Sequence, residues 1–486
     1  MDYLDPKKQS RHRVILLVGY CVIAVAIAIT TLILVYQAYG FGLGQNGNVI
    51  QNGLVFISSQ PVSAQITING VKKSQTTSRL VMPSGIYNFN LSRTGYRDWQ
   101  RIIEVAGGSV SHYDYPLLIP ETLKPTVLQE LASAPLISSQ SPDRHWLFIQ
   151  RLDTPTFDLL DLKNPTKPAV SLALPIVTYS KAISTDSWQV LEWADDNLHL
   201  VMLHNFDSKF EYILVNRQNP DESVNLTTTL GLGNIQLSLR NKKYDQYYIY
   251  DVTIASLKTM VLSNPSMTTV VERALSYKTF GSDTVLFVTD TEAPSGKVLL
   301  KMVVGSQLYT LRSLPFSSKY LMDLADYSGN LYVAVSAVSD DKVYIYKDPI
   351  GQLKTLPNHV VVPMQVMHII DPNFISFSAI THQFILAENG SQFTVYDFEN
   401  RNPYRYSLAL PIDAPQLNAS WLDGSHLSVV SKGKLVLFDF DSANQQITVS
   451  ASSKYLPIFS TDFRTLYYFD FINQVWSLNQ VSLVVN

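Results

Sequence analysis

Apolar and polar positions follow different patterns in three parts of this chain, and the first part is the simplest. Residues Val14 to Tyr36 form an unbroken run of 23 positions without a charged side chain. At a rise of about 1.5 Å per residue, such a run makes a helix of roughly 34 Å, long enough to cross the hydrocarbon core of a bilayer. The pattern therefore predicts a transmembrane helix over residues 14–36.

The flanks of this run differ in charge. Lys7, Lys8, Arg11 and Arg13 precede it, whereas residues 37–52 carry no charge. Positive flanks stay on the cytoplasmic side, so residues 1–13 are expected in the cytoplasm and the rest of the chain outside it. A cleaved signal peptide is the alternative. The run exceeds the usual 7 to 15 residues of such a segment and lacks a small-residue cleavage site, which favours an uncleaved single-pass anchor in the cell membrane.

From residue 53 the pattern changes to the period of two that is typical of β-strands. Residues 64–69 (AQITIN) alternate and Gly70 follows as a turn, and two further hairpins are expected before residue 120. Six or seven short strands in this space predict a compact β-sandwich over residues 53–120. The Gly-, Asn- and Gln-rich residues 37–52 before it are expected to form a flexible linker.

The small domain also carries a spaced motif, S-x-P-x-x-A-x-I-x-I-x-G. It runs from Ser59 through Pro61 and Ala64 to Gly70, and Gly85 and Gly95-Tyr96 follow. This pattern resembles the PEGA domain, a small β-module of microbial surface proteins. The resemblance implies an exported, surface-tethered protein of bacterial type.

The match to the PEGA pattern is incomplete. Residues 61–64 read Pro-Val-Ser-Ala in place of Pro-Glu-Gly-Ala, and residues 74–77 read Ser-Gln-Thr-Thr in place of Gly-x-Thr-Pro. Tyr96 and Trp99 are the candidate aromatic residues of this domain. They are expected to pack a turn against the sheet, and stacking on a carbohydrate is the alternative.

The large region, residues 124–486, is repetitive. Turn-like clusters recur at intervals of about 39 to 52 residues, close to the blade length of β-propellers. The markers of these turns are Asp143, Asp195, Lys242, Ser282, Ser328, Pro372, Asp423 and Asp462. Each turn is followed by paired hydrophobic strands, so each unit supplies about four strands, which is one blade.

Two of these turns, Trp193-Ala-Asp-Asp-Asn197 and Trp421-Leu-Asp-Gly-Ser425, resemble the W-S-P-D-G turn of TolB-type propellers. Eight units are visible, and seven remain possible if the unit at Arg240 is absorbed into its neighbours. The last unit lacks one strand, which residues 126–129 can supply to close the ring and remove its free edges. The predicted fold is thus all-β beyond the anchor.

Composition narrows the class of protein. Charged residues are 16% of the chain and hydrophobic residues 46%, with 27 Tyr and 21 Phe, which favours strands. The net charge is −3 and no basic run follows the N-terminus, so nucleic-acid binding is not expected. The single cysteine, Cys21, lies in the apolar run and excludes a disulfide within one chain.

No constellation of catalytic residues emerges from the sequence. G-x-S-x-G, H-E-x-x-H and Gly-rich phosphate-binding motifs are missing, and the nine histidines are scattered. Asp340-Asp341 and Asp439-Phe-Asp441 are conceivable calcium ligands, but solvated turn acids are the expected interpretation. No catalytic, cofactor-binding or metal-binding residues are therefore assigned, and no cofactor is expected.

The sequence thus predicts a non-enzymatic, membrane-anchored binding or scaffold protein that contacts cell-envelope polysaccharide or a partner protein. A propeller hydrolase acting on glycans or peptides at the envelope is the alternative, and a structural spacer is the third. Exposed aromatic or apolar patches on the rim of the propeller would favour binding over the spacer.

Overall fold

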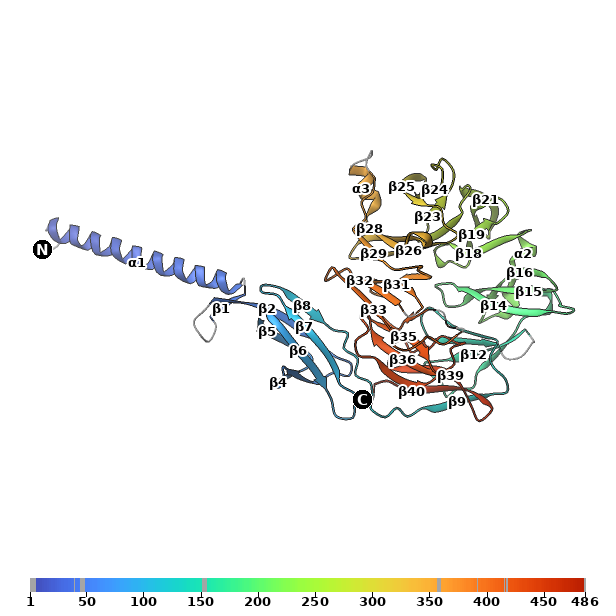
Figure 1. Cartoon of the computed structure of the whole chain (residues 1–486), viewed down its shortest axis with the longest axis horizontal. Coiled ribbons are helices and arrows are strands. Elements are labelled where there is room, and N and C mark those ends of the chain that lie inside the picture. The colour runs from blue at the N-terminus through green and yellow to red at the C-terminus, as the bar shows by residue number, and fades with distance from the viewer. Residues whose placement is uncertain are drawn as a thin grey trace. The chain divides into compact units, whose positions relative to one another are not determined.

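The computed structural model describes residues 6–38, 40–43, 49–150, 155–355, 360–390, 392–414, 416 and 418–484. The chain divides into two compact units. The first comprises residues up to Thr122 together with Val484–Asn486, and the second comprises Leu123–Leu483. Figure 1 gives the element labels used below.

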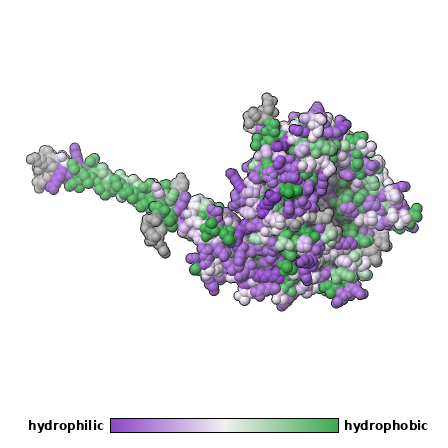
Figure 2. Space-filling view, in the orientation of Figure 1, coloured by the Kyte–Doolittle hydropathy of each residue, from purple (hydrophilic) through white to green (hydrophobic). Residues whose placement is uncertain are grey.

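The first unit begins with helix α1, Pro6–Ala38, which contains the predicted transmembrane segment. Its residues Ser10–Gln37 are long and apolar enough to cross a membrane. These side chains are exposed, and Figure 2 shows the apolar surface along the helix. Apart from the contact of Tyr36 with Phe41 of β1 (Phe41–Leu43), the apolar side chains of the helix are exposed, which suits a lipid environment.

The linker expected over residues 37–52 is shorter in the structure. Strand β1 (Phe41–Leu43) pairs antiparallel with the start of β2 (Val49–Ile57). The backbone N–H of Asn52 donates to the carbonyl of Gly40. The prediction of a fully flexible linker was therefore wrong for these residues, because backbone pairing needs no apolar side chains and a polar, Gly-rich sequence can join a sheet edge.

The β-sandwich of the first unit consists of two sheets. One has the order β4-β3-β6-β7, and in the other β2 lies between β1 and β5 and also pairs in parallel with β8. The bounds are β3 Gln65–Ile68, β4 Val71–Gln75, β5 Ser78–Pro83, β6 Gly85–Ser92, β7 Trp99–Val105 and β8 Val110–Tyr113. Alternate side chains such as Ile66, Ile68, Phe89 and Leu91 fill the space between the sheets.

One buried hydroxyl cluster explains the spacing of the motif in the small domain. Oγ of Ser59 lies 2.6 Å from Oγ1 of Thr76, which also accepts the backbone N–H of Ala64 at 2.9 Å. The same serine hydroxyl donates to the carbonyl of Pro61 at 2.6 Å. Gly70, at φ +80°, then closes the β3–β4 turn in the left-handed region that favours glycine. The motif therefore fixes a turn and holds two strand ends together.

The second unit is a β-propeller. Its described residues form eight four-stranded antiparallel sheets, so the structure decides between the seven and eight units left open by the sequence. Blades 1 to 4 follow in chain order, from the innermost strand outward. Their strands are β10 Ile137–Gln140, β11 Trp146–Gln150, β12 Thr156–Asp161, β13 Val170–Ala173; β14 Asp186–Trp193, β15 His199–Phe206, β16 Lys209–Asn216, β17 Val224–Asn225; β18 Ile235–Leu239, β19 Gln246–Asp251, β20 Ser256–Val261, β21 Asn264–Val271; β22 Ser276–Phe280, β23 Thr284–Thr289, β24 Lys297–Val304 and β25 Gln307–Pro315.

Blades 5 to 8 continue in the same way, and two short helices, α2 (Leu226–Thr229) and α3 (Pro349–Thr355), lie in connections. The strands are β26 Tyr320–Tyr327, β27 Asn330–Ala337, β28 Lys342–Lys347, β29 Gln365–His368; β30 Phe374–Phe377, β31 Phe384–Asn389, β32 Gln392–Asp397, β33 Asn402–Ser407; β34 Ser420–Trp421, β35 His426–Ser431, β36 Lys434–Asp439, β37 Gln446–Ser450; β38 Ile458–Phe459, β39 Thr465–Ile472, β40 Val475–Ser482 and β9 Thr126–Leu131.

The ring closes as the sequence predicted. Strand β9, the first strand of the propeller in the chain, pairs antiparallel with β40, the last, with Leu131 opposite Trp476 and Gln129 opposite Leu478. Figure 1 shows β9 beside β40 and the blades arranged in a ring. Because the eighth blade takes strands from both ends of the unit, the ring cannot open without breaking one sheet.

Candidate binding surfaces of the propeller

The two aromatic residues singled out in the small domain are buried. Trp99 lies wholly within the core of the sandwich, with its ring centroid 6.0 Å from that of Tyr115. Tyr96 is buried beside it, and the guanidinium of Arg93 lies 5.5 Å from the centre of its ring. A sugar stacks on an exposed ring face. The burial therefore supports the packing interpretation for both residues.

Acidic residues in the marker turns are committed to turn geometry. Oγ of Ser141 donates to Asp143, and Oγ of Ser460 donates to Asp462 at 2.6 Å. In each case the same carboxylate oxygen accepts the backbone N–H two residues later, from His145 at 3.0 Å and from Arg464 at 3.1 Å. These acids close the hairpins between the first two strands of their blades.

The two tryptophan turns also have a structural role. The indole N–H of Trp193 donates to Ser139 of the preceding blade at 2.9 Å, and that of Trp421 donates to Ser376 at 3.0 Å. These bonds link neighbouring blades at their innermost strands.

Each tryptophan turn holds a histidine that the sequence reasoning did not pair with it. Asp196 accepts from Nδ1 of His199 at 2.6 Å, and Asp423 from Nδ1 of His426 at 2.8 Å. The signal was present, because both pairs have the spacing D-x-x-H.

The acids considered as calcium ligands have other partners. The carboxylate of Asp340 contacts the hydroxyl of Tyr344 at 2.6 Å and Nζ of Lys342 at 3.3 Å. Asp341 accepts the backbone N–H of Asp371 at 2.8 Å. Among the described residues, no group of three or more His, Cys, Asp or Glu has the geometry to hold a metal ion.

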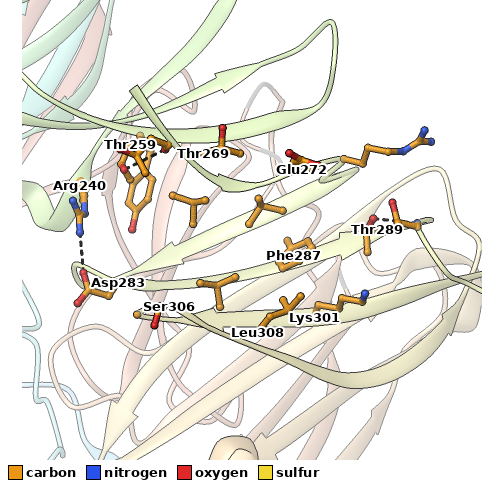
Figure 3. Close-up of a pocket in the computed structure, with 18 of the residues that line it drawn as sticks. Arg240, Thr259, Thr269, Glu272, Asp283, Phe287, Thr289, Lys301, Ser306 and Leu308 are labelled. Atoms are coloured by element: carbon orange, nitrogen blue, oxygen red, sulfur yellow. Dashed lines mark hydrogen bonds and ion pairs between the residues drawn. The ribbon is translucent and has the colours of Figure 1, made fainter. Parts of the chain in front are cut away.

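A groove of about 850 Å³ lies between blades 3 and 4. One wall is the outer strand β21 with the turn that follows it, and the other is one face of β23, β24 and β25 (Figure 3). Arg240 and Asp283, paired at 2.9 Å, lie at one end, and Glu272, Arg273 and Glu292 lie at the other. The groove therefore runs along the strands, from one face of the propeller to the other.

The floor of the groove combines apolar and hydroxyl-bearing side chains with one buried cation. Phe287 and Val303 belong to the core between the two blades, and Thr289 is buried beside them. The side chain of Lys301 is only 8% exposed, and its Nζ lies 3.1 Å from Oε2 of Glu292, whose side chain is 77% exposed. Figure 3 shows Lys301 on the floor near Thr289.

A second surface consists of loops at one face of the propeller. In an antiparallel blade, the turn between the second and third strands and the connection to the next blade lie at the same strand ends. Exposed large apolar side chains recur on these connections, including Leu136, Ile176, Val177, Ile183, Phe316, Ile370 and Leu456. We call this surface the apolar loop face.

The first loop of this face is held in a defined shape. Val177 and Ile183 are 93% and 94% exposed, the most exposed large apolar side chains of the described propeller residues. The carboxylate of Asp207 accepts the backbone N–H groups of Ile183 and Ser184, each at 2.8 Å. These hydrogen bonds lower the pKa of Asp207 to about 2. The loop is thus pinned by a charged group rather than by burial of its apolar side chains.

Comparison with known proteins assigns the small domain to a family. Residues 52–119 match the family described as "PEGA domain". This segment is a PEGA domain. The PEGA domain occupies a minor part of the chain, and the comparison with proteins of curated function found no match.

The propeller has distant structural relatives. The Dos1 propeller is 13% identical, with a TM-score of 0.44, over 75% of this chain and 95% of that one. The propeller domain of Cps50 (Swd1) from Myceliophteria thermophila is 13% identical, with a TM-score of 0.37, over 66% and 97%. The dihydro-heme d1 dehydrogenase NirN is 12% identical, with a TM-score of 0.43, over 67% of each chain. At these scores the likenesses carry no argument about activity.

Proposed function

We propose that this protein is a membrane-anchored, non-catalytic binding or scaffold protein that presents its PEGA domain and propeller outside the cytoplasm to a partner in the cell envelope. The observation that carries the proposal is the apolar loop face. Monomeric soluble proteins rarely leave many large apolar side chains exposed on one face, and such surfaces mark interaction sites. A spacer would have no need of them.

A protein partner fits this face better than a polysaccharide. The exposed side chains are mainly aliphatic, as at Ile176, Val177 and Ile183. Aliphatic groups gain stability by being buried against other apolar groups, whereas sugars stack on aromatic rings. The polar clusters support a non-catalytic role, because the acids and histidines described above are engaged in turns.

The proposal is tested by photo-crosslinking in cells that express the full-length chain. A photoreactive phenylalanine analogue at Val177 or Ile183 should crosslink a partner protein. The same analogue at Ile380, which is 65% exposed on a hairpin at the opposite face, is the matched control. Equal crosslinking at all three positions, or none at any, would contradict the proposal.

Topology and catalysis have their own tests. Protease added to intact cells should cleave the chain after residue 40 and spare the segment before the helix. Protection of residues 40–486 would overturn the orientation, and release of product from envelope glycans or peptides by the purified chain would overturn the non-catalytic role.

A further inference from the structure

The groove between blades 3 and 4 has features that the apolar loop face does not explain. Its floor holds Lys301, whose side chain is nine-tenths buried. An ammonium group has three N–H donors, and burial makes an unfilled donor costly. Among the described residues, Lys301 has a single hydrogen-bond partner, Glu292. Two of its donor positions are thus open to a ligand.

The carboxylate of Glu292 can move away from Lys301 into solvent. Glu292 lies on the turn between β23 and β24, and its side chain is 77% exposed. A carboxylate so exposed is well solvated without a partner. Its ion pair with Lys301 therefore contributes little to the stability of the fold. A carboxylate from a ligand can therefore replace that of Glu292 without leaving a buried charge unpaired.

The shape of the groove indicates an extended chain. Four consecutive residues of β21, Thr268 to Val271, line one wall, and Glu272 and Arg273 of the following turn continue it. Alternate residues of a strand point to opposite faces, so a consecutive run means that β21 presents its edge to the groove. β21 is the outermost strand of its blade, and within the described part of the chain it pairs with β20 alone. The opposite wall follows β23, whose six residues extend about 20 Å.

The edge is also open to pairing. Residues Asn264–Val271 of β21 carry no charge, and most of them are exposed. Natural edge strands are blunted by charges, proline or bulges. Pro265 blunts the start of β21 and a register shift interrupts its pairing with β20 near Val271, so the uncharged residues 266–269 between them are the template for another strand. A peptide that adds to such an edge gains affinity from main-chain hydrogen bonds and specificity from the side chains that alternate into the groove.

We propose that this groove binds an extended segment of a partner protein beside β21, with an acidic side chain of that segment reaching Lys301 in place of Glu292. A glycan fits less well, because the aromatic rings that line the groove, Tyr248 and Phe287, are buried and offer no stacking face. Glu292 then acts as a latch that competes with the ligand.

The test is selection from a displayed library of random seven-residue peptides on the full-length chain in detergent. Selected peptides should be enriched in glutamate or aspartate at one position, flanked by β-forming residues. Removing a charged hydrogen bond to Lys301 should weaken their binding about tenfold or more. Lys301→Gln and Leu308→Glu should both weaken peptide binding. Glu292→Gln, which frees Lys301, should instead strengthen peptide binding severalfold.

Leu308→Glu is included in case Lys301→Gln fails to fold. Leu308 lines the groove but is exposed, so its substitution should not disturb the fold. Selected peptides without acidic enrichment, or equal binding to all four proteins, would overturn the proposal. So would Lys301-dependent binding of oligogalacturonate, used as an acidic glycan probe, without peptide binding. Crosslinking from Val177 reports on the other surface, so the function proposed above stands or falls separately.

Discussion

The imidazole of His426 lies between two carboxylates, with Nδ1 2.8 Å from Asp423 and Nε2 3.6 Å from Asp439. The ring is buried at the base of blade 7. Burial lowers the pKa of an imidazole, but here the charge of Asp423, its hydrogen bond to the ring and the charge of Asp439 outweigh burial. Together they raise the pKa of His426 to about 9.

This arrangement makes the stability of the propeller depend on pH. The folded pKa lies above the value of about 6.5 for unfolded histidine. The stabilisation is therefore complete below about pH 6.5 and is lost as the pH rises through about 9. Its size is about 3 kcal/mol. Urea unfolding followed by tryptophan fluorescence should show lower stability at pH 9.5 than at pH 6.

His426→Gln should reduce that difference by about 3 kcal/mol, whereas the exposed His368→Gln should keep it. An unchanged pH profile in His426→Gln would refute the assignment.

A second buried group contributes over a different pH range. Glu388 of blade 6 accepts the backbone N–H of Ala419, at the edge of blade 7, at 2.9 Å. Burial raises its pKa to about 8, although the Ala419 hydrogen bond lowers it. Because the folded state favours the protonated form, this stabilisation is complete below about pH 4.5 and is lost as the pH rises through about 8.

Glu388→Gln should therefore reduce the slope of unfolding free energy against pH between 5 and 8, because glutamine keeps an oxygen for Ala419 but does not ionise. Glu130→Gln, on an exposed side chain, is the matched control. The same slope in both variants would show that Glu388 does not titrate in this range.

Ring closure can be measured with two substitutions on one strand. Leu131 of β9 is buried in the core shared by blades 1 and 8, whereas Val127 of the same strand is 58% exposed. Leu131→Ala should cost about 3 kcal/mol of propeller stability, the usual result of a cavity in a core, and Val127→Ala should cost under about 1 kcal/mol. Thermal unfolding of both variants, monitored by circular dichroism, gives the comparison. Equal losses would mean that β9 adds little to the core.

The hydroxyl cluster of the PEGA domain gives a local prediction. Thr76→Val keeps the shape of the side chain but removes the oxygen that accepts the N–H of Ala64. Leaving a buried donor unsatisfied costs about 1 to 3 kcal/mol. Hydrogen exchange of residues 52–119 in the full-length chain should therefore become faster. The same change at the exposed neighbouring residue, Thr77→Val, should leave the exchange rates unchanged.

Most of the architecture could be predicted from local patterns. The apolar run at 14–36, the motif from Ser59 to Gly70 and the turn spacing of the propeller each depend on neighbouring residues, and each led to the observed element. The exchange of β9 was also predictable, since the last repeat lacked a strand. The linker was the exception, because the pairing of β1 with β2 depends on backbone groups that composition does not report.

The candidate site could not be predicted in this way. Lys301 is one lysine among many in the sequence, and its partner Glu292 lies nine residues earlier without any motif. Lys301 becomes a candidate binding residue because blades 3 and 4 meet beside it. They bury its side chain while Glu292 stays in solvent. Likewise, Tyr96 and Trp99 are prominent in the sequence, but packing of two sheets places them in the core.

By itself, therefore, the sequence determined what kinds of modules this protein has and their order, because periodicity, turn spacing and an uncharged apolar run are properties of adjacent residues. Only the tertiary structure decided the number of blades, the role of the D-x-x-H pairs, and which charges and apolar side chains remain available to a partner. Those are properties of surfaces built from segments far apart in the chain, where burial and pairing depend on which neighbours the fold provides.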